Sequence, residues 1–147
     1  MREDIYDYLI NYGFTEEDLS RIKEENDKVY FAILKNITDN IEFLENKGLE
    51  KNEVIQVVRK NPYIITAGTR KKQLLDELYN SIFNKDEIKE LIIKYPYIYI
   101  VNPIELKEVI DYLNNVKLNL KDIINENIDV LSFDLENIKK YLNNRGI

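Results

Sequence analysis

Gly48-Leu49-Glu50-Lys51-Asn52-Glu53-Val54 is the stretch that decides the fold, because related stretches recur along the chain at a fixed spacing. The others occupy residues 13–19, 82–88 and 117–123, so their starting points lie 35, 34 and 35 residues apart. A period in this range is the sequence signature of an array of helical units. Such arrays usually act by presenting a surface, and each unit packs only against its neighbours.

Each stretch combines the end of one helix with the start of another. Three of the chain's four glycines stand at the equivalent helix end, where glycine adopts positive φ without strain. A capping side chain follows, and an acid comes three residues later, as in Thr15 with Asp18 and Asn84 with Glu87. Apolar residues then recur at helical spacing. Each unit is therefore predicted to contain two helices.

A proline stops the second helix in two of the units. Pro62 and Pro96 lie 34 residues apart, and proline cannot continue a helix. The apolar residues after each proline can be interpreted as a short strand, but the repeat favours a buried turn or short 3-10 segment. The first unit has no such proline, and there we expect residues 29–41 to form one helix that leads into the second unit.

The predicted fold class is all-α, an α-solenoid of about four repeats of 34–35 residues with two helices and a short 3-10 turn each. We expect one domain over residues 1–147. Within it, residues 1–39 form a degenerate first unit, residues 40–101 the best-formed repeats, and residues 102–147 further degenerate units. A plain helical bundle with accidental repetition stays open as an alternative.

Composition excludes several kinds of chemistry. The chain has no cysteine and no histidine, so it lacks the thiolate nucleophile, the commonest general base near neutral pH and the commonest zinc ligands. Acidic runs such as residues 16–18 lie at helix starts, where capping explains them. We expect no enzyme activity, no metal and no cofactor. The polar N-terminus and the short apolar runs predict a cytoplasmic protein without a membrane segment.

Charge is spread unevenly over the chain. The net charge is −6, and residues 1–40 carry ten acids against five bases. No acid lies between Glu53 and Asp76, so this window is locally basic. The residues predicted to contact nucleic acid are Arg59, Lys60, Arg70, Lys71 and Lys72, together with Lys94, which lies one period after Lys60. Lysine and arginine bind phosphates without regard to sequence.

The same residues also have an ordinary structural explanation. Cations near helix C-termini interact favourably with the helix dipole. Tyr63, Tyr95, Tyr97 and Tyr99 lie near the basic window and suit base stacking, yet tyrosine is also a common filler with a polar tip. Convergence of the cations on one face favours the nucleic-acid interpretation, whereas scatter over the surface favours the structural one.

The pattern resembles a known family. Leu44 followed by Gly48-Leu49, a cap, a second helix and then Pro62-Tyr63-Ile64-Ile65 is similar to the repeat of the mitochondrial transcription termination factors, the mTERF family. The resemblance is best over residues 40–101. It implies an α-solenoid of two helices and a short 3-10 helix per repeat. It also implies non-catalytic binding of DNA or RNA through a basic concave face.

Other helical repeats fit the sequence less well. Tetratricopeptide units need small alanines where their helices cross, and this chain has only Ala32 and Ala67. No column of polar residues indicates pentatricopeptide repeats, and the ankyrin signature is missing. The first functional hypothesis is therefore a nucleic-acid-binding module. The second is a protein-interaction scaffold, and no small-molecule substrate or membrane partner is indicated.

Overall fold

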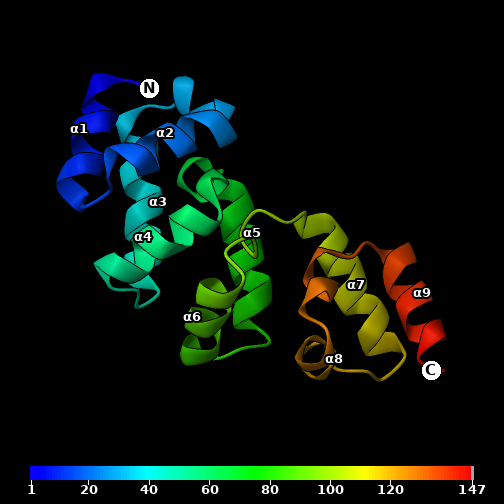
Figure 1. The fold of residues 1–147 in the computed structure, drawn as a ribbon. Coiled ribbons are helices and arrows are strands. Elements are labelled where there is room, and N and C mark those ends of the chain that lie inside the picture. The colour runs from blue at the N-terminus through cyan, green and yellow to red at the C-terminus, as the bar shows by residue number, and fades with distance from the viewer. Residues whose placement is uncertain (147) are drawn as a thin grey trace.

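The computed structural model describes residues 1–146, which form an extended row of helix pairs with the two termini at opposite ends (Figure 1). The pairs are α1 (Glu3–Tyr12) with α2 (Glu16–Glu25), α3 (Leu34–Asn46) with α4 (Lys51–Lys60), α5 (Thr69–Asn80) with α6 (Lys85–Lys94), and α7 (Pro103–Asn115) with α8 (Leu120–Glu126). A last helix, α9 (Leu135–Asn144), packs on α7. The predicted all-α solenoid is confirmed.

The helix starts follow the predicted caps. Thr15 accepts a hydrogen bond from the backbone N–H of Asp18, whose carboxylate accepts one from the N–H of Thr15 at 2.9 Å. Asn84 and Glu87 form the same reciprocal pair at 2.9 and 3.0 Å. Each pair satisfies two backbone donors that the first helical turn leaves free. The sequence therefore determined where these helices begin.

Three second helices are followed by a 3-10 helix. These are η1 (Asp27–Tyr30), η2 (Pro62–Thr66) and η3 (Ile128–Ser132), and residues 96–100 form consecutive turns after α6. The predicted turn at Pro62 is confirmed. The expected helix over residues 29–41 is wrong, because Asn26 accepts a hydrogen bond from the N–H of Lys28 and starts η1, and α3 begins only at Leu34.

One core runs along the whole row. The equivalent position near the end of each first helix is buried, and it holds Leu9, Leu44, Tyr79, Leu113 and Leu142. Helix α1 packs on α3, α4 on α6, and α5 on α7, so each unit covers the apolar face of the next. Within residues 1–146, no helix has both the length and the apolar character needed to cross a membrane.

Asparagine side chains link consecutive units. The Asn26 amide donates at 3.0 Å both to the carbonyl of Pro62 and to the hydroxyl of Thr66 in the next unit. The Asn61 amide donates to the carbonyl of Pro96 at 3.3 Å. Both asparagines are buried, and each also accepts from the first turn of its own 3-10 helix. We refer to these contacts as the asparagine bridges.

The third unit lacks this bridge. Tyr95 occupies the position that Asn26 and Asn61 hold in the earlier units, and a phenol has no amide to donate. The partner helix also differs, since α8 has seven residues whereas α2, α4 and α6 have ten. The contact between α6 and α8 is correspondingly less complete, and an open cleft lies between them.

Lys117 occupies a position that favours glycine. It starts the fourth copy of the motif, where Gly48 stands in the second, and its φ is +60° against +95° for Gly48. A β-carbon in this region crowds the following carbonyl. The backbone after α7 is therefore strained at this residue.

Replacing Lys117 by glycine is expected to raise the free energy of unfolding by about 0.5–1 kcal/mol, because the β-carbon clash is removed at some cost in chain entropy. Urea denaturation followed by circular dichroism measures the change. Lys117→Ala is the control, since it removes the long side chain and keeps the β-carbon. A gain of equal size in both variants would assign the effect to the side chain instead of the backbone.

Candidate nucleic-acid interface

The six predicted cations lie in four different environments. Arg59 is in an ion pair, Lys72 is buried, and Lys60 and Lys94 stand at the ends of α4 and α6. Arg70 and Lys71 lie in the first turn of α5. The six cations are therefore not all available to a ligand, because Arg59 is paired and Lys72 is buried.

Arg59 joins the first two units. Its guanidinium donates two hydrogen bonds, at 2.8 and 3.0 Å, to the two carboxylate oxygens of Asp18. The Asp18 side chain is only 11% exposed, and it also forms the cap of α2 with Thr15. The hydrogen bonds from Arg59 lower the pKa of Asp18 from 3.8 to about 2, against the opposing effect of burial. These contacts join α4 to α2 and occupy the Arg59 guanidinium.

Lys72 is buried and contacts residues of α3. Its ammonium donates to the side-chain oxygen of Asn40 and lies 4.7 Å from the centre of the Phe43 ring. The Asn40 amide in turn donates to the carbonyls of Ile65 at 2.8 Å and Ala67 at 3.2 Å. Burial lowers the pKa of Lys72, and the Asp39 carboxylate opposes this shift. Lys72 therefore connects α5 to α3 and η2, and its ammonium faces the interior.

Lys60 and Lys94 are exposed, and both have partners. The Lys60 ammonium donates to the carbonyl of Ile93 at 3.3 Å, near the last turn of α6. Lys94 pairs with Glu90 one turn earlier on the same helix, at 2.8 Å. Cations at helix C-termini are stabilised by the helix dipole. The repetition of a cation at this position has a structural explanation in both units.

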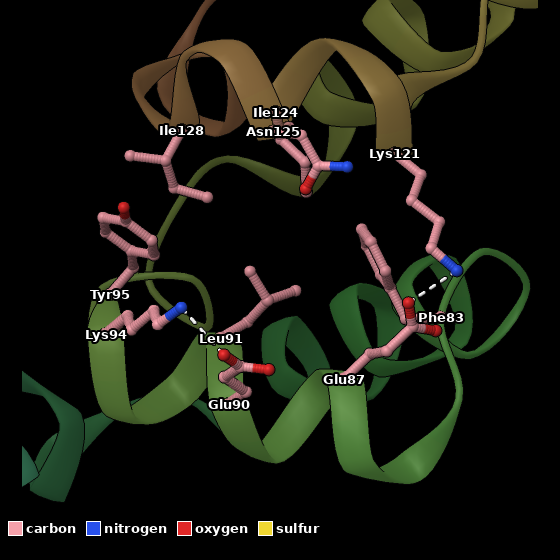
Figure 2. Close-up of a pocket in the computed structure, with 10 residues that line it drawn as sticks. All are labelled: Phe83, Glu87, Glu90, Leu91, Lys94, Tyr95, Lys121, Ile124, Asn125 and Ile128. Carbon is pink, nitrogen blue, oxygen red and sulfur yellow. Dashed lines mark ion pairs between the residues drawn. The ribbon is translucent and has the colours of Figure 1, made fainter.

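Lys94 also borders the cleft between α6 and α8, which Figure 2 shows from the side with its lining residues. The cleft encloses about 250 Å³, and its apolar lining comes from Phe83, Leu91, Ile124 and Ile128. An ion pair between Lys121 and Glu87 joins the two helices at 2.5 Å across the opening. Positive and negative charges at the rim therefore compensate each other, and the cleft offers no net attraction to phosphate.

Lys71 lies beside a second cation that the sequence analysis did not select. Lys28 of η1 and Lys71 of α5 both line a hollow of about 310 Å³, together with Tyr63 and Thr66 of η2. Tyr63 is 46% exposed. We call these four residues the turn-edge surface.

The cations of this surface are free of acidic partners. Among residues 1–146, no carboxylate lies within ion-pair distance of Lys28, Lys71 or the neighbouring Arg70. Most other cations of the chain are paired, including Arg59 and Lys94. Lys28 stands 35 residues before Tyr63, at the equivalent position of the preceding unit. An alignment of the η1 and η2 segments would have identified Lys28 as the residue equivalent to Tyr63.

Exchange of Lys72 for methionine is expected to lower the free energy of unfolding by roughly 1–3 kcal/mol, because the side-chain oxygen of Asn40 loses its buried donor. Thermal and urea denaturation measure the change. Lys71→Met is the matched control, and at its more exposed site we expect a change within about 0.5 kcal/mol. Equal effects in the two variants would contradict the structural role of Lys72.

The pair between Asp18 and Arg59 is expected to make stability sensitive to acid. Because the folded pKa of Asp18 is about 2 and its ordinary value is 3.8, its contribution is complete above about pH 4. That contribution is lost as the pH falls toward 2. Arg59→Gln should reduce stability at neutral pH and flatten this part of the pH profile, as measured by denaturation midpoints. Arg21→Gln, which breaks an exposed pair with Glu25, should leave the profile unchanged.

Comparison with known proteins places the chain in a family. The mTERF family model matches residues 2–143. A similar protein is the mitochondrial transcription termination factor MTERF15 of Arabidopsis thaliana, which is 29% identical over 111 residues. The matched region covers 74% of this chain and 25% of that relative, so the chain spans about a quarter of its length. The relative is named as mitochondrial, and the cytoplasmic location expected for this chain stays a prediction. The helical repeats, their 3-10 turns and the family match over nearly the whole chain show that this protein belongs to the mTERF family.

Proposed function

We propose that the chain is a non-catalytic module that binds nucleic acid through the turn-edge surface. The observation that carries the proposal is that Lys28 and Lys71 line one hollow with the exposed Tyr63, with no acid paired to either cation in the described residues. Two cations at one hollow suit the phosphate backbone, and an exposed aromatic side chain at the same hollow suits a base.

Local charge is the relevant quantity for this acidic chain. Its net charge of −6 opposes non-specific attraction to a polyanion, so binding has to come from a surface where cations are left over. Ion pairs neutralise most of the other exposed cations, such as Lys35 with Asp39 and Lys107 with Asp111. Lys28, Arg70 and Lys71 form the remaining concentration around the η1 and η2 turns. This revises the predicted set toward Arg70 and Lys71 and adds Lys28.

The family supports the proposal in general terms. The Arabidopsis relative is named as a transcription termination factor, which is a function exercised on nucleic acid. The chain corresponds to a quarter of that relative, so an activity of the whole relative is not transferred to it. A composition without histidine or cysteine supports a binding role over a catalytic one.

A protein-interaction scaffold is the second candidate. The cleft between α6 and α8 favours it, because apolar side chains line a hollow whose rim charges compensate each other. This cleft lies away from the turn-edge surface and shares no residue with it. The two candidates are therefore separable by mutation.

Binding is tested by fluorescence anisotropy with mixed-sequence DNA and RNA oligonucleotides, titrated at low and at moderate salt. Affinity should fall steeply with salt. Lys28→Glu combined with Lys71→Glu should weaken binding about tenfold or more and reduce the slope against salt by about 2.

The control carries the same change of charge at distant sites. Lys85→Glu combined with Lys117→Glu alters two exposed lysines of α6 and the α7–α8 connection, neither of which has an acidic partner within residues 1–146. It should retain most of the affinity. If the wild-type chain binds no oligonucleotide at low salt, or if both double variants lose affinity equally, the turn-edge surface is not the binding site.

A further inference from the structure

We infer that the turn-edge surface takes unpaired bases, so that the chain prefers single-stranded nucleic acid to duplex. The inference rests on the proposed function and specifies the form of nucleic acid. The exposed aromatic side chains beside the free cations are the observations that carry it.

Phe31 follows directly after η1, three residues beyond Lys28. Side chains three residues apart eclipse each other in a 3-10 helix. The N–H of Phe31 donates to the carbonyl of Lys28 at 3.1 Å, so the two residues close one turn of η1. Tyr63 and Thr66 have the same spacing in η2, and both line the hollow. By this spacing we expect the Phe31 ring on the side of η1 that carries Lys28, next to the turn-edge surface.

The exposure of these rings is unusual for this chain. Phe31 is 88% exposed and Tyr63 is 46% exposed, whereas Tyr79 and Tyr99 are fully buried in the core. Tyr30, next to Phe31, is 50% exposed. Exposed aromatic surface is unfavourable in water, and its concentration in one segment marks a contact site. Elements η1 and η2 pack together, so the rings belong to one region of the molecule.

Adjacent charge identifies the occupant. Lys28 and Lys71 line the same hollow as Tyr63, and neither cation has an acidic partner among residues 1–146. An apolar protein surface would leave these cations without a counter-charge. Each nucleotide of a nucleic-acid strand, by contrast, supplies a phosphate and a planar base. This combination of a basic surface and aromatic platforms is characteristic of single-strand binding.

The strandedness follows from the accessibility of the base. In a duplex the faces of each base are covered by neighbouring base pairs, and an aromatic side chain reaches them only after unstacking. In a single strand the bases turn out freely and stack on exposed rings. Stacking on one aromatic residue strengthens binding about tenfold. Phosphate contacts, by contrast, are available from either form.

The test compares one labelled oligonucleotide alone and as a blunt duplex with its complement, at the same low salt. Wild-type protein should bind the single strand at least about tenfold more tightly. Phe31→Ala should remove about tenfold of that affinity and leave duplex binding unchanged, while Phe31→Trp keeps a ring and should retain the preference. A fluorescent aminopurine in the single strand should be quenched by wild-type protein and less by Phe31→Ala.

Ile104→Ala is the control, because this residue of α7 is also apolar and 69% exposed but belongs to another unit. Circular dichroism and thermal denaturation check that each variant folds. Equal affinity for single strand and duplex, with no effect of Phe31→Ala, would overturn the inference while the proposed function stands. Absence of binding to either form removes the proposed function itself. Concentration-dependent self-association that Phe31→Ala abolishes would assign this ring to a second copy of the chain and also overturn the inference.

Discussion

The hydrogen bond from an asparagine side chain to the next unit is the buried polar contact that aligns the first three units. Asn26 and Asn61 stand where a second helix ends, and each uses one side chain for two tasks. Its oxygen accepts from the first turn of the 3-10 helix that follows, and its amide donates to the Pro62 or Pro96 carbonyl of the next unit. Because these groups are buried, leaving them without partners would cost roughly 1–3 kcal/mol for each. The bridges therefore fix both the direction of the chain after α2 and α4 and the distance between neighbouring units. This arrangement also places η1 next to η2 and so creates the surface to which we assign binding.

The third junction shows what happens without a bridge. Tyr95 replaces the asparagine, and its ring packs near Tyr97 with centroids 6.1 Å apart. Helix α8 has seven residues whereas α6 has ten, and the last turn of α6 lines the cleft opposite the end of α8 and the first residue of η3. The two changes act at the same place, since Tyr95 and Ile128 both line the cleft of Figure 2. Contact between α5 and α7, together with the ion pair between Glu87 and Lys121, joins the units there. The first three units are thus linked more completely to one another than to the fourth.

Several charged side chains in this protein connect one helix to another. Arg59 with Asp18 and Lys47 with Asp76 each join different helices, at 2.8 and 2.6 Å. Lys72 performs a similar task through Asn40 without any carboxylate. A count of positive residues in the central window therefore overstates the charge available to a ligand. Part of the unpaired charge lies at the η1 and η2 turns, where Lys28 and Lys71 line one hollow. Differences between equivalent positions, such as Lys28 in one turn and Tyr63 in the next, give this edge its mixed basic and aromatic character.

The sequence alone determined the repeat, the helix starts and the turn at Pro62, because these features depend on contacts between residues a few positions apart. The side chains of Thr15 and Asn84 cap their helices by accepting hydrogen bonds from the backbone N–H three residues later. A proline acts on its immediate neighbours. The extra turn at η1 was not predicted, since no proline marks it and the role of Asn26 is evident only from its hydrogen bond to Pro62.

Tertiary structure alone decided which of the predicted cations are paired or buried. Arg59 finds its carboxylate 41 residues away and Lys72 its amide 32 residues away, and local sequence gives no sign of either. Lys28 and Lys71 come together for the same reason, because the stacking of units brings distant turns side by side.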